Sequence, residues 1–367
     1  SIKTLRVYSL PEGKPGDKPG FHALKKATGS GLVRVIIGGG DGSVMWVAGE
    51  AEKHGIAVAR DIALGIIPLG TGNDFSRHLG WGGTNPRAAT LRRNGYSRVA
   101  DIMRMFLAGK PEPFDVWKVQ VETDPKTGCV YTNNKEGGEK AEVGGTVERL
   151  MILYFSMGDD GQSGYAFEPN RVESQFGNLF QYGIAVFNTY VEEKCSGDSL
   201  EDKIQSVHAG KDSNAPMAFH CTEDLDGPEL THNPGCLLFL NVDSYAGGKA
   251  HLWRRSSPHA GVDEPIDPAL LERGASAKDN LIEVATARSL ARLGASTLPA
   301  VGARRIMQTA SAFIQFHQGT AEEPIEDFFQ VDGEFYRVVN PVCCRVVHHQ
   351  MLQVLHNPRY VESDEEE

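Results

Sequence analysis

The stretch VRVIIGGGDGS, Val33–Ser43, is an apolar run that ends in a glycine-rich loop. The stretch IALGIIPLGTGND, Ile62–Asp74, repeats this order further along the chain. Short β-branched runs that end in glycine predict buried strands. Helical patterns follow the two loops at Val44–His54 and Phe75–Leu79. Because strands alternate with helices, we expect a parallel sheet with helices on its faces.

The composition of the two loops favours phosphate binding. Glycine lacks a Cβ atom, so the backbone N–H groups of such loops can approach an anion closely, and the helix that follows adds its N-terminal dipole. Neither loop continues into Gly-Lys-Ser/Thr or fits GxGxxG, so the pattern favours phosphoryl transfer from a nucleotide over NAD binding. The candidate nucleotide-binding residues are Gly39, Gly40, Asp41, Gly42 and Ser43 in the first loop and Gly70, Thr71, Gly72, Asn73 and Asp74 in the second.

Asp41 places a carboxylate inside the first loop. Without a partner it would repel a nucleotide phosphate, so we expect it to bind Mg²⁺ or to act on a proton. In the second loop, Asn73 and Asp74 can cap the next helix. The alternative is that the first loop is only a tight turn, and that Asn73 and Asp74 have a pure packing role. Loops after neighbouring parallel strands open at the same sheet edge, which favours the phosphate site.

The second half of the chain has a different pattern, mainly that of antiparallel strands. Alternation typical of a half-exposed strand begins at Asp115–Val121, after the segment Pro111-Glu112-Pro113. Further strands are predicted at Met151–Met157, Gly235–Val242, Asn280–Ala285, Ala312–Phe316 and Arg337–Val347, and a helix at Phe176–Tyr190. Stretches rich in Gly, Ser, Pro and charged residues predict loops at 122–148, 196–216 and 254–279.

Bulk composition excludes several classes of protein. The chain has 367 residues and a formal net charge of −11, which disfavours nucleic acid as a partner. Its six cysteines form no CxxC pair, which predicts reduced thiols in a cytoplasmic protein. No apolar run has the length of a membrane span or the form of a signal peptide. On a strand, His348 and His349 would face opposite sides, which disfavours a metal site there.

Longer strings around both loops resemble the eukaryotic diacylglycerol kinases. Gly39–Ser43 is similar to the family's GGDGT, and Pro68–Gly82 retains its PLGTGNDxxRxLGWG. The second string is far more specific than GGDG, which sphingosine kinases and NAD kinases share. Strings similar to the family's accessory motifs are Phe155–Asp160, Leu240–Gly248, Ala303–Ile306 and Gln330–Glu334. Asp159 departs from the family pattern, which has an apolar residue there.

The resemblance implies an α/β plus mainly β fold. A three-layer α/β ATP-binding domain at residues 1–114 would precede an antiparallel β-sandwich at 115–339, with the active site in the cleft between them. We expect residues 340–358 to pack back on the first domain, and residues 360–367 to form an acidic tail. The family's amino-terminal strand, its NPxSG loop and the zinc-binding lipid modules of animal members are expected to be missing from this chain.

The resemblance also implies an activity. The chain would use ATP and Mg²⁺ to phosphorylate the primary hydroxyl of diacylglycerol to phosphatidic acid in lipid signalling, as a cytoplasmic protein recruited peripherally to membranes. Alternatives are a kinase of a sphingoid base or ceramide, and an inactive kinase fold that serves as a regulatory binding module.

Roles for single residues follow from the same resemblance. Glu334 would be the general base, a role for which Asp41 competes, and Asp41 would lie beside the metal of Mg·ATP. Asp160 and Arg77 would shape the substrate cleft. The residues alone leave another interpretation open, because Val331–Glu334 is also typical of a two-residue Asp-Gly hairpin turn followed by an exposed glutamate.

Overall fold

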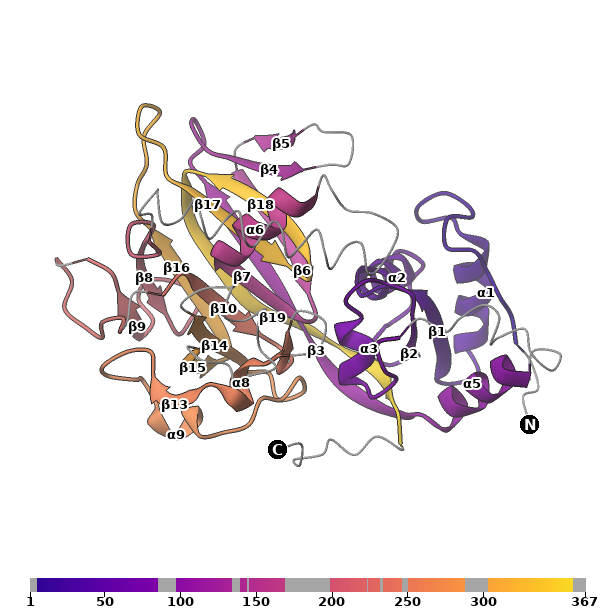
Figure 1. Ribbon diagram of the computed structural model, residues 1–367. Coiled ribbons are helices and arrows are strands. Elements are labelled where there is room, and N and C mark those ends of the chain that lie inside the picture. Colours follow the sequence, from indigo (N-terminus) through magenta and orange to yellow (C-terminus); the bar gives the residue numbers. More distant parts are fainter. Residues whose placement is uncertain are drawn as a thin grey trace. The chain divides into compact units, whose positions relative to one another are not determined.

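The chain divides into two compact units in the computed structural model shown in Figure 1. Unit 1 comprises Ser1–Phe114 and Gln350–Glu367, and unit 2 comprises Asp115–His349. The predicted helix Phe176–Tyr190 and the predicted acidic tail 360–367 lie outside the described residues. The structure describes residues 5–84, 97–133, 139–143, 145–168, 199–222, 224–231, 234–245, 250–287 and 303–358.

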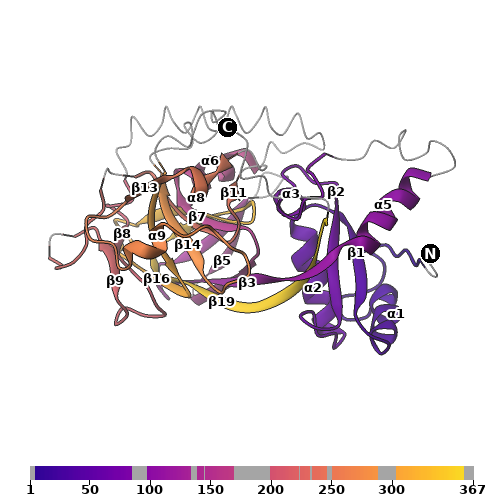
Figure 2. The ribbon, with the colours of Figure 1, turned by 90° about the horizontal axis from the view of Figure 1, so that it is seen from below.

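Unit 1 contains the predicted parallel strands. Figure 2 shows β1 (Val33–Gly39) and β2 (Ile62–Pro68) side by side, and they pair in parallel along their whole length. The end of β19 (Pro341–His356) joins β2 in parallel, with Val354 opposite Leu64. Within its described residues, unit 1 has the helices α1 (Pro19–Thr28), α2 (Gly42–Lys53), α3 (Asp74–His78) and α5 (Ser97–Ala108).

The sequence of α2 explains why it packs on the sheet. Its buried residues Val44, Val47, Ala48 and Ala51 recur at the i, i+3, i+4, i+7 spacing that places them on one helix face. The apolar face turns inward, and the first turn of α2 follows the first glycine loop directly. The predicted strand–loop–helix order is therefore confirmed.

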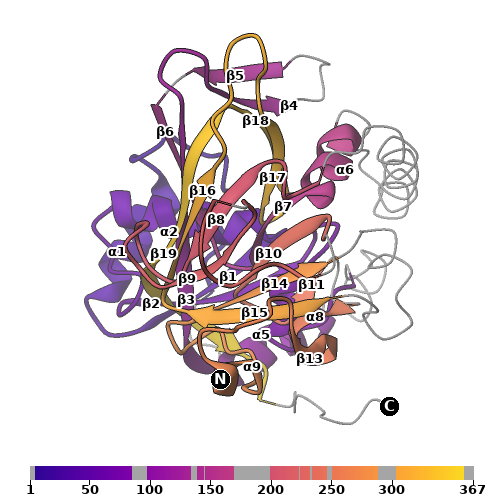
Figure 3. The same ribbon diagram turned by 90° about the vertical axis from the view of Figure 1, so that its left-hand side faces the viewer.

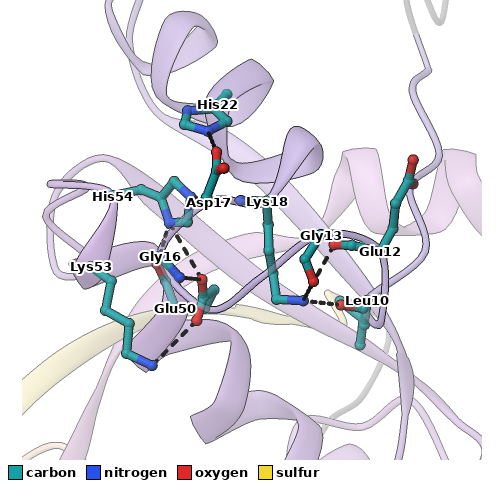
Figure 4. Close-up of polar contacts among 10 residues, drawn as sticks. All are labelled: Leu10, Glu12, Gly13, Gly16, Asp17, Lys18, His22, Glu50, Lys53 and His54. Atoms are coloured by element: carbon teal, nitrogen blue, oxygen red, sulfur yellow. Dashed lines mark hydrogen bonds and ion pairs between the residues drawn. The ribbon is translucent and has the colours of Figure 1, made fainter.

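A polar cluster holds the segment before α1 against α2 (Figure 4). The Lys18 ammonium donates to three backbone carbonyls within residues 10–13, at 2.8–3.4 Å, and lies 5.0 Å from the ring centre of Trp46. The backbone N–H of Gly16 donates to the buried carboxylate of Glu50. These contacts satisfy two charged groups that have little exposure, which is how buried charges are tolerated. The segment is thereby fixed on α2.

Unit 2 is built mainly from antiparallel strands. One sheet has the order β13-β15-β14-β10-β7-β17-β18-β4-β5, antiparallel except for the β13–β15 pair. Figure 3 shows β10, β14 and β15 side by side in this sheet. A second group of strands has the order β19-β16-β8-β9, and β3 pairs with β19 and β6.

The elements of unit 2 are defined by the following bounds. The strands are β3 (Lys110–Thr123, which begins in unit 1), β4 (Cys129–Asn133), β5 (Glu139–Val143), β6 (Gly145–Met151), β7 (Tyr154–Gly158), β8 (Ile204–His208), β9 (Met217–His220), β10 (Cys236–Leu240), β11 (Ser244–Tyr245), β12 (Ala250–His251), β13 (Ser257–Ala260), β14 (Ile282–Ala287), β15 (Arg304–Thr309), β16 (Ser311–Phe316), β17 (Glu326–Val331) and β18 (Glu334–Val339). The helices are α6 (Asp159–Phe167), α8 (Leu252–Arg255) and α9 (Pro268–Leu271).

One apolar core joins the two groups of strands in unit 2. Trp117 of β3 and Ile314 of β16 belong to the same buried cluster as Phe155 of β7 and Phe239 of β10. Side chains from two sheet faces that share one core form a sandwich. The predicted class, α/β plus mainly β, is confirmed.

The three predicted loops contain regular structure, so these predictions were wrong. Residues 122–148 include β4, β5 and the start of β6, 196–216 include β8, and 254–279 include β13 and α9. Strand β5 forms the end of its sheet. Edge strands commonly carry charged residues, which discourage pairing with other chains, and a polar composition therefore does not exclude a strand.

Two predicted strands are each divided by a turn. Met151–Met157 breaks between β6 and β7, at residues 152–153. Arg337–Val347 breaks at Asn340, which has a left-handed φ of 48° and accepts the N–H of Ile325 at 2.8 Å through its side chain. Asparagine tolerates this backbone conformation better than most residues, so it can separate β18 from β19.

Candidate nucleotide and catalytic site

The two glycine loops contact each other backbone to backbone. A Cβ atom on Gly70 would lie 2.7 Å from the Cα atom of Gly40, and a Cβ atom on Gly40 would lie 3.2 Å from the Cα atom of Gly70. The N–H of Leu69 donates to the carbonyl of Gly39 at 2.9 Å. Only glycine permits this approach. The loops therefore form one surface at the carboxyl ends of β1 and β2.

Asp41 connects the first loop to the helix after the second. Its carboxylate accepts the backbone N–H groups of Asp74 and Phe75, at 3.1 and 3.2 Å. N–H groups in the first turn of a helix have no partner within that helix. Asp41 supplies the acceptor for two of them, so it caps α3 from a distant part of the chain. These backbone partners were not indicated by the sequence, and the expected role of Asp41 toward Mg²⁺ or a proton stays a prediction.

Asn73 does not cap α3 with its side chain, contrary to the prediction. It is fully buried and has a left-handed φ of 58°. Its side-chain amide instead pairs with the N–H and the carbonyl of Gly70, at 2.9 and 2.8 Å, and donates to the carbonyl of Gly83 at 3.0 Å. Asn73 thus fixes the shape of the second loop.

Asp41 and Asp74 form a close pair of carboxylates. Burial, and then the negative charge of Asp74, raises the pKa of Asp41 from 3.8 to about 6, although the backbone N–H groups oppose this rise. Asp74 itself is 2% exposed. Adjacent carboxylates with little access to water repel each other, and a bound cation relieves this repulsion.

The carboxylate pair fits a magnesium–nucleotide complex. A Cβ atom on Gly72 would lie 3.4 Å from Oδ2 of Asp74 and 3.7 Å from Oδ2 of Asp41, so both oxygens border the same space. Proteins often bind Mg²⁺ through one or two carboxylates together with substrate phosphates. Across the described ranges, no three His, Cys, Asp or Glu residues gather where they could hold a metal ion. The two carboxylates of Asp41 and Asp74 suit a Mg²⁺ ion that binds together with nucleotide phosphates.

The other loop residues differ in what surrounds them. The Ser43 hydroxyl lies against Gly39, because a Cβ atom on Gly39 would be 2.3 Å from Oγ of Ser43. Gly42 is exposed and has no protein atom within 4 Å of such a Cβ position. Thr71 is partly exposed. The Cβ position of Gly42, at the start of α2, therefore faces space that is free of protein atoms.

Arg77 lies along the second loop. Its Nε donates to the carbonyl of Gly72 at 3.4 Å, and its guanidinium leaves no room for a side chain at Gly83. These contacts stabilise the loop and leave its predicted substrate role untested.

Asp160 lies in the interior of unit 2, in a polar network. It is fully buried, and its carboxylate accepts hydrogen bonds from the hydroxyls of Ser156 and Tyr245. The Ser156 oxygen also lies 2.9 Å from the side-chain oxygen of Gln330. The network connects three of the family-like motifs. The neighbouring Asp159 is the first residue of α6. A negative charge at the start of a helix interacts favourably with the helix dipole, which explains why an acidic residue can stand here in place of an apolar one.

Glu334 follows a tight hairpin turn. Asp332 and Gly333 have φ values of 49° and 82° between β17 and β18, which two-residue hairpins commonly require. The Asp332 carboxylate accepts three backbone N–H groups, from residues 152–154, at 2.7–3.1 Å. Glu334 is exposed. The hairpin with an exposed glutamate is confirmed, and the role as a base stays a prediction.

Two residues near Glu334 were not predicted from the sequence. The Tyr336 hydroxyl donates to Oε2 of Glu334 at 2.7 Å and accepts from Nε of Arg149 at 2.9 Å. Tyr336 follows Glu334 by two residues on one strand, so a period of two could have indicated their common face. Arg149 carried no such signal. The carboxylate of Glu334 therefore has an ordered phenol as its neighbour.

Similarity to known proteins extends over most of the chain. The family profile described as diacylglycerol kinase catalytic domain matches residues 8–105, and the profile described as diacylglycerol kinase accessory domain matches residues 150–335. In the described residues, no helix is both long enough and apolar enough to cross a membrane.

Curated relatives are similar to the chain at moderate identity. The probable diacylglycerol kinase 3 of Caenorhabditis elegans is 26% identical over 95% of this chain and 40% of its own length. The eye-specific diacylglycerol kinase of Drosophila melanogaster is 29% identical over 74% of this chain and 16% of its length. Diacylglycerol kinase 4 of Arabidopsis thaliana is 26% identical, over 91% of this chain and 71% of its length. The chain thus spans less than half of the two animal relatives.

Among solved structures, a yeast NADH kinase complexed with NADH is similar to the chain with a TM-score of 0.35 and 8% identity, over 90% of this chain and 64% of that one. A similarity of this size says nothing about function.

Proposed function

Because this chain belongs to the diacylglycerol kinase family, we propose that it transfers the γ-phosphate of ATP to the primary hydroxyl of 1,2-diacylglycerol and forms phosphatidic acid. The observation that carries the proposal is the contact between the two glycine loops, with the Asp41–Asp74 carboxylate pair beside it. Such a surface suits a charged phosphate chain together with its metal ion.

In this proposal the two loops bind the nucleotide. Backbone N–H groups of both loops and the hydroxyls of Ser43 and Thr71 donate to phosphate oxygens, and the first turn of α2 adds its dipole. Asp41 and Asp74 would hold Mg²⁺, which would supply positive charge beside the transferred phosphoryl group. The residues that donate from the backbone in this proposal are Gly39, Gly40, Gly42 and Gly72. The N–H of Gly70 already donates to Asn73, so Gly70 contributes through its close approach to Gly40.

Glu334 accepts the proton of the lipid hydroxyl in this proposal. Its carboxylate is exposed on a short, well-anchored hairpin, so a substrate hydroxyl can reach it. Both carboxylate oxygens of Asp41 already accept backbone N–H groups, so we assign Asp41 to the metal rather than to the proton. A well-placed base is worth about 10²- to 10⁴-fold in rate.

The lipid substrate determines how the protein meets a membrane. We propose that the acyl chains of diacylglycerol remain in the bilayer while its hydroxyl enters the site, so the chain attaches to the membrane surface from the cytoplasm. Arg77 and Asp160 are retained as substrate-site residues in this proposal.

A lipid panel tests the proposal. The chain is incubated with labelled ATP, Mg²⁺ and mixed micelles that contain 1,2-diacylglycerol, sphingosine or ceramide, and the labelled lipids are separated. We expect labelled phosphatidic acid, and little product from the other two lipids. Label that appears only on sphingosine or ceramide would overturn the assigned substrate, and absence of any labelled lipid would favour an inactive kinase fold.

A further inference from the structure

We propose that Tyr336 and Arg149 are positioning residues that hold the Glu334 carboxylate in one orientation for proton transfer. This inference rests on the proposed function, because it concerns the residue that accepts the proton of the lipid hydroxyl. It adds two residues from neighbouring parts of unit 2 to the site.

The direction of the hydrogen bonds is determined by chemistry. The Arg149 guanidinium has donors but no acceptor, so at 2.9 Å the Tyr336 oxygen must accept from it. A phenol has only one proton, and Oε2 of Glu334 lies 2.7 Å away as an acceptor. The proton of Tyr336 therefore points at Glu334, and the chain Arg149–Tyr336–Glu334 runs in one direction.

The phenol is held firmly. Tyr336 is 4% exposed, and the Arg149 guanidinium lies 5.1 Å from the centre of its ring. Nη1 of Arg149 also donates to the carbonyl of Glu148 at 2.9 Å, which fixes the arginine. An ordered donor favours one rotamer of an otherwise exposed carboxylate, and such preorganisation lowers the cost of reaching the reactive geometry.

The packing of the ring decides which variant is informative. The rings of Tyr336 and Phe329, together with Arg149, border a small apolar cavity of about 20 Å³. Its other walls are valine side chains: Val119, Val121, Val130, Val147, Val331 and Val338. Removing the whole ring would enlarge this cavity and destabilise the sandwich. Tyr336→Phe removes only the hydroxyl and keeps the wall.

Unit 2 offers a matched control. The Arg337 guanidinium lies 4.2 Å from the ring centre of Tyr131, and Arg337 forms an ion pair with Glu326 at 3.1 Å. This is a second arginine–tyrosine contact, between β18 and its neighbour β4. Glu326 pairs with Val339, at the end of the hairpin away from the turn. Tyr131→Phe therefore removes a comparable hydroxyl that has no part in the proposal.

The experiment measures kcat and the KM for ATP on diacylglycerol micelles. For Tyr336→Phe we expect kcat to fall about tenfold with an unchanged KM for ATP and an unchanged melting temperature, as expected for one lost hydrogen bond to a charged group. For Tyr131→Phe all three values should stay unchanged. In a Glu334→Asp background, whose carboxylate is withdrawn from the phenol, Tyr336→Phe should cause no further fall.

A second pair of variants guards against misfolding of Tyr336→Phe. Arg149→Met removes the donor to the phenol and should lower kcat about threefold, whereas Arg149→Lys keeps a donor and should restore most of it.

A wild-type chain without turnover on diacylglycerol would overturn the proposed function and this inference together. Two results would overturn the positioning role alone in an otherwise active chain. One is a kcat that neither Tyr336→Phe nor Arg149→Met changes, and the other is a Tyr336→Phe effect of equal size with and without Glu334→Asp.

Discussion

Asp41-Gly42 and Asp332-Gly333 are the same dipeptide in two different structures. In unit 1, Asp41 has a right-handed φ of −56° and precedes α2. In unit 2, Asp332 has a left-handed φ of 49° and turns a hairpin. Both carboxylates accept backbone N–H groups from another motif: Asp41 from the start of α3, and Asp332 from residues 152–154.

Each dipeptide has a second carboxylate nearby, and the two second carboxylates differ in their exposure to solvent. Beside Asp41 lies the buried Asp74, whose charge contributes to raising the pKa of Asp41 to about 6. After Asp332 comes Glu334, which is exposed. The same motif therefore contributes to a buried carboxylate pair in unit 1, where we propose a cation, and rigidly supports an accessible carboxylate in unit 2. This difference underlies the assignment of the metal to Asp41 and of the proton to Glu334.

The largest expected effect concerns the support of the hairpin. Asp332→Ala leaves three backbone N–H groups without their acceptor and should lower the free energy of unfolding by about 3 kcal/mol. Asp332→Asn keeps the oxygen that serves Leu153 and Tyr154, and should cost about 1 kcal/mol. Urea titration measures both. Equal stability of the two variants would contradict the anchoring role of the carboxylate.

The next effect concerns the open space at the start of α2. Gly42→Ala meets no protein atom within 4 Å, so it should not reduce stability, yet its methyl group would occupy space that the proposal gives to phosphate. We expect ATP affinity to fall about 30-fold, equivalent to roughly 2 kcal/mol. Gly49→Ala, which also meets no protein atom and lies further along α2, is the control and should bind ATP normally. Equal affinities of the two variants would count against the phosphate site.

The smallest effect is a change of stability with pH. A carboxyl whose pKa is raised in the folded state, here from 3.8 to about 6, adds stability below its unfolded pKa and loses it as the pH rises through the folded pKa. Without Mg²⁺, Asp41→Asn should therefore be about 1–2 kcal/mol more stable than the wild type at pH 7, because the loss of repulsion exceeds the loss of hydrogen bonding.

The pH series supplies the control for this prediction. Well below pH 3.8, where Asp41 of the wild type is protonated in both states, the advantage of Asp41→Asn should disappear. Denaturant titrations from about pH 3 to pH 8 measure the difference. An advantage that stays constant over this range would mean that the charge of Asp41 has no part in it.

Local sequence predicted the parts of the fold that depend on neighbouring residues. The apolar runs of β1 and β2 and the glycines after them determine strand, loop and helix within a short segment. The Asp-Gly hairpin before Glu334 was predictable for the same reason. The edge strand β5 was missed, because its polar composition resembles that of a loop until its pairing partner is known.

Contacts between distant residues could not be predicted. Asp41 caps α3, which begins 33 residues later in the chain. Arg149 donates a hydrogen bond to Tyr336, which is 187 residues away in the sequence. Nothing in the spacing of these residues indicates such partners, because they depend on how the strands are ordered in space. The sequence therefore indicated neither the capping of α3 by Asp41 nor the contact between Tyr336 and Arg149.

The most direct measurement compares ATP binding with turnover in Glu334→Gln. Calorimetric titration with Mg·ATP should give a Kd within about twofold of the wild type, whereas transfer of labelled phosphate to diacylglycerol should fall about 10³-fold. Glu326→Gln, an exposed glutamate on the same hairpin, is the control and should retain turnover. Turnover that survives in Glu334→Gln, or ATP binding that is lost together with it, would contradict the division of roles between Asp41 and Glu334.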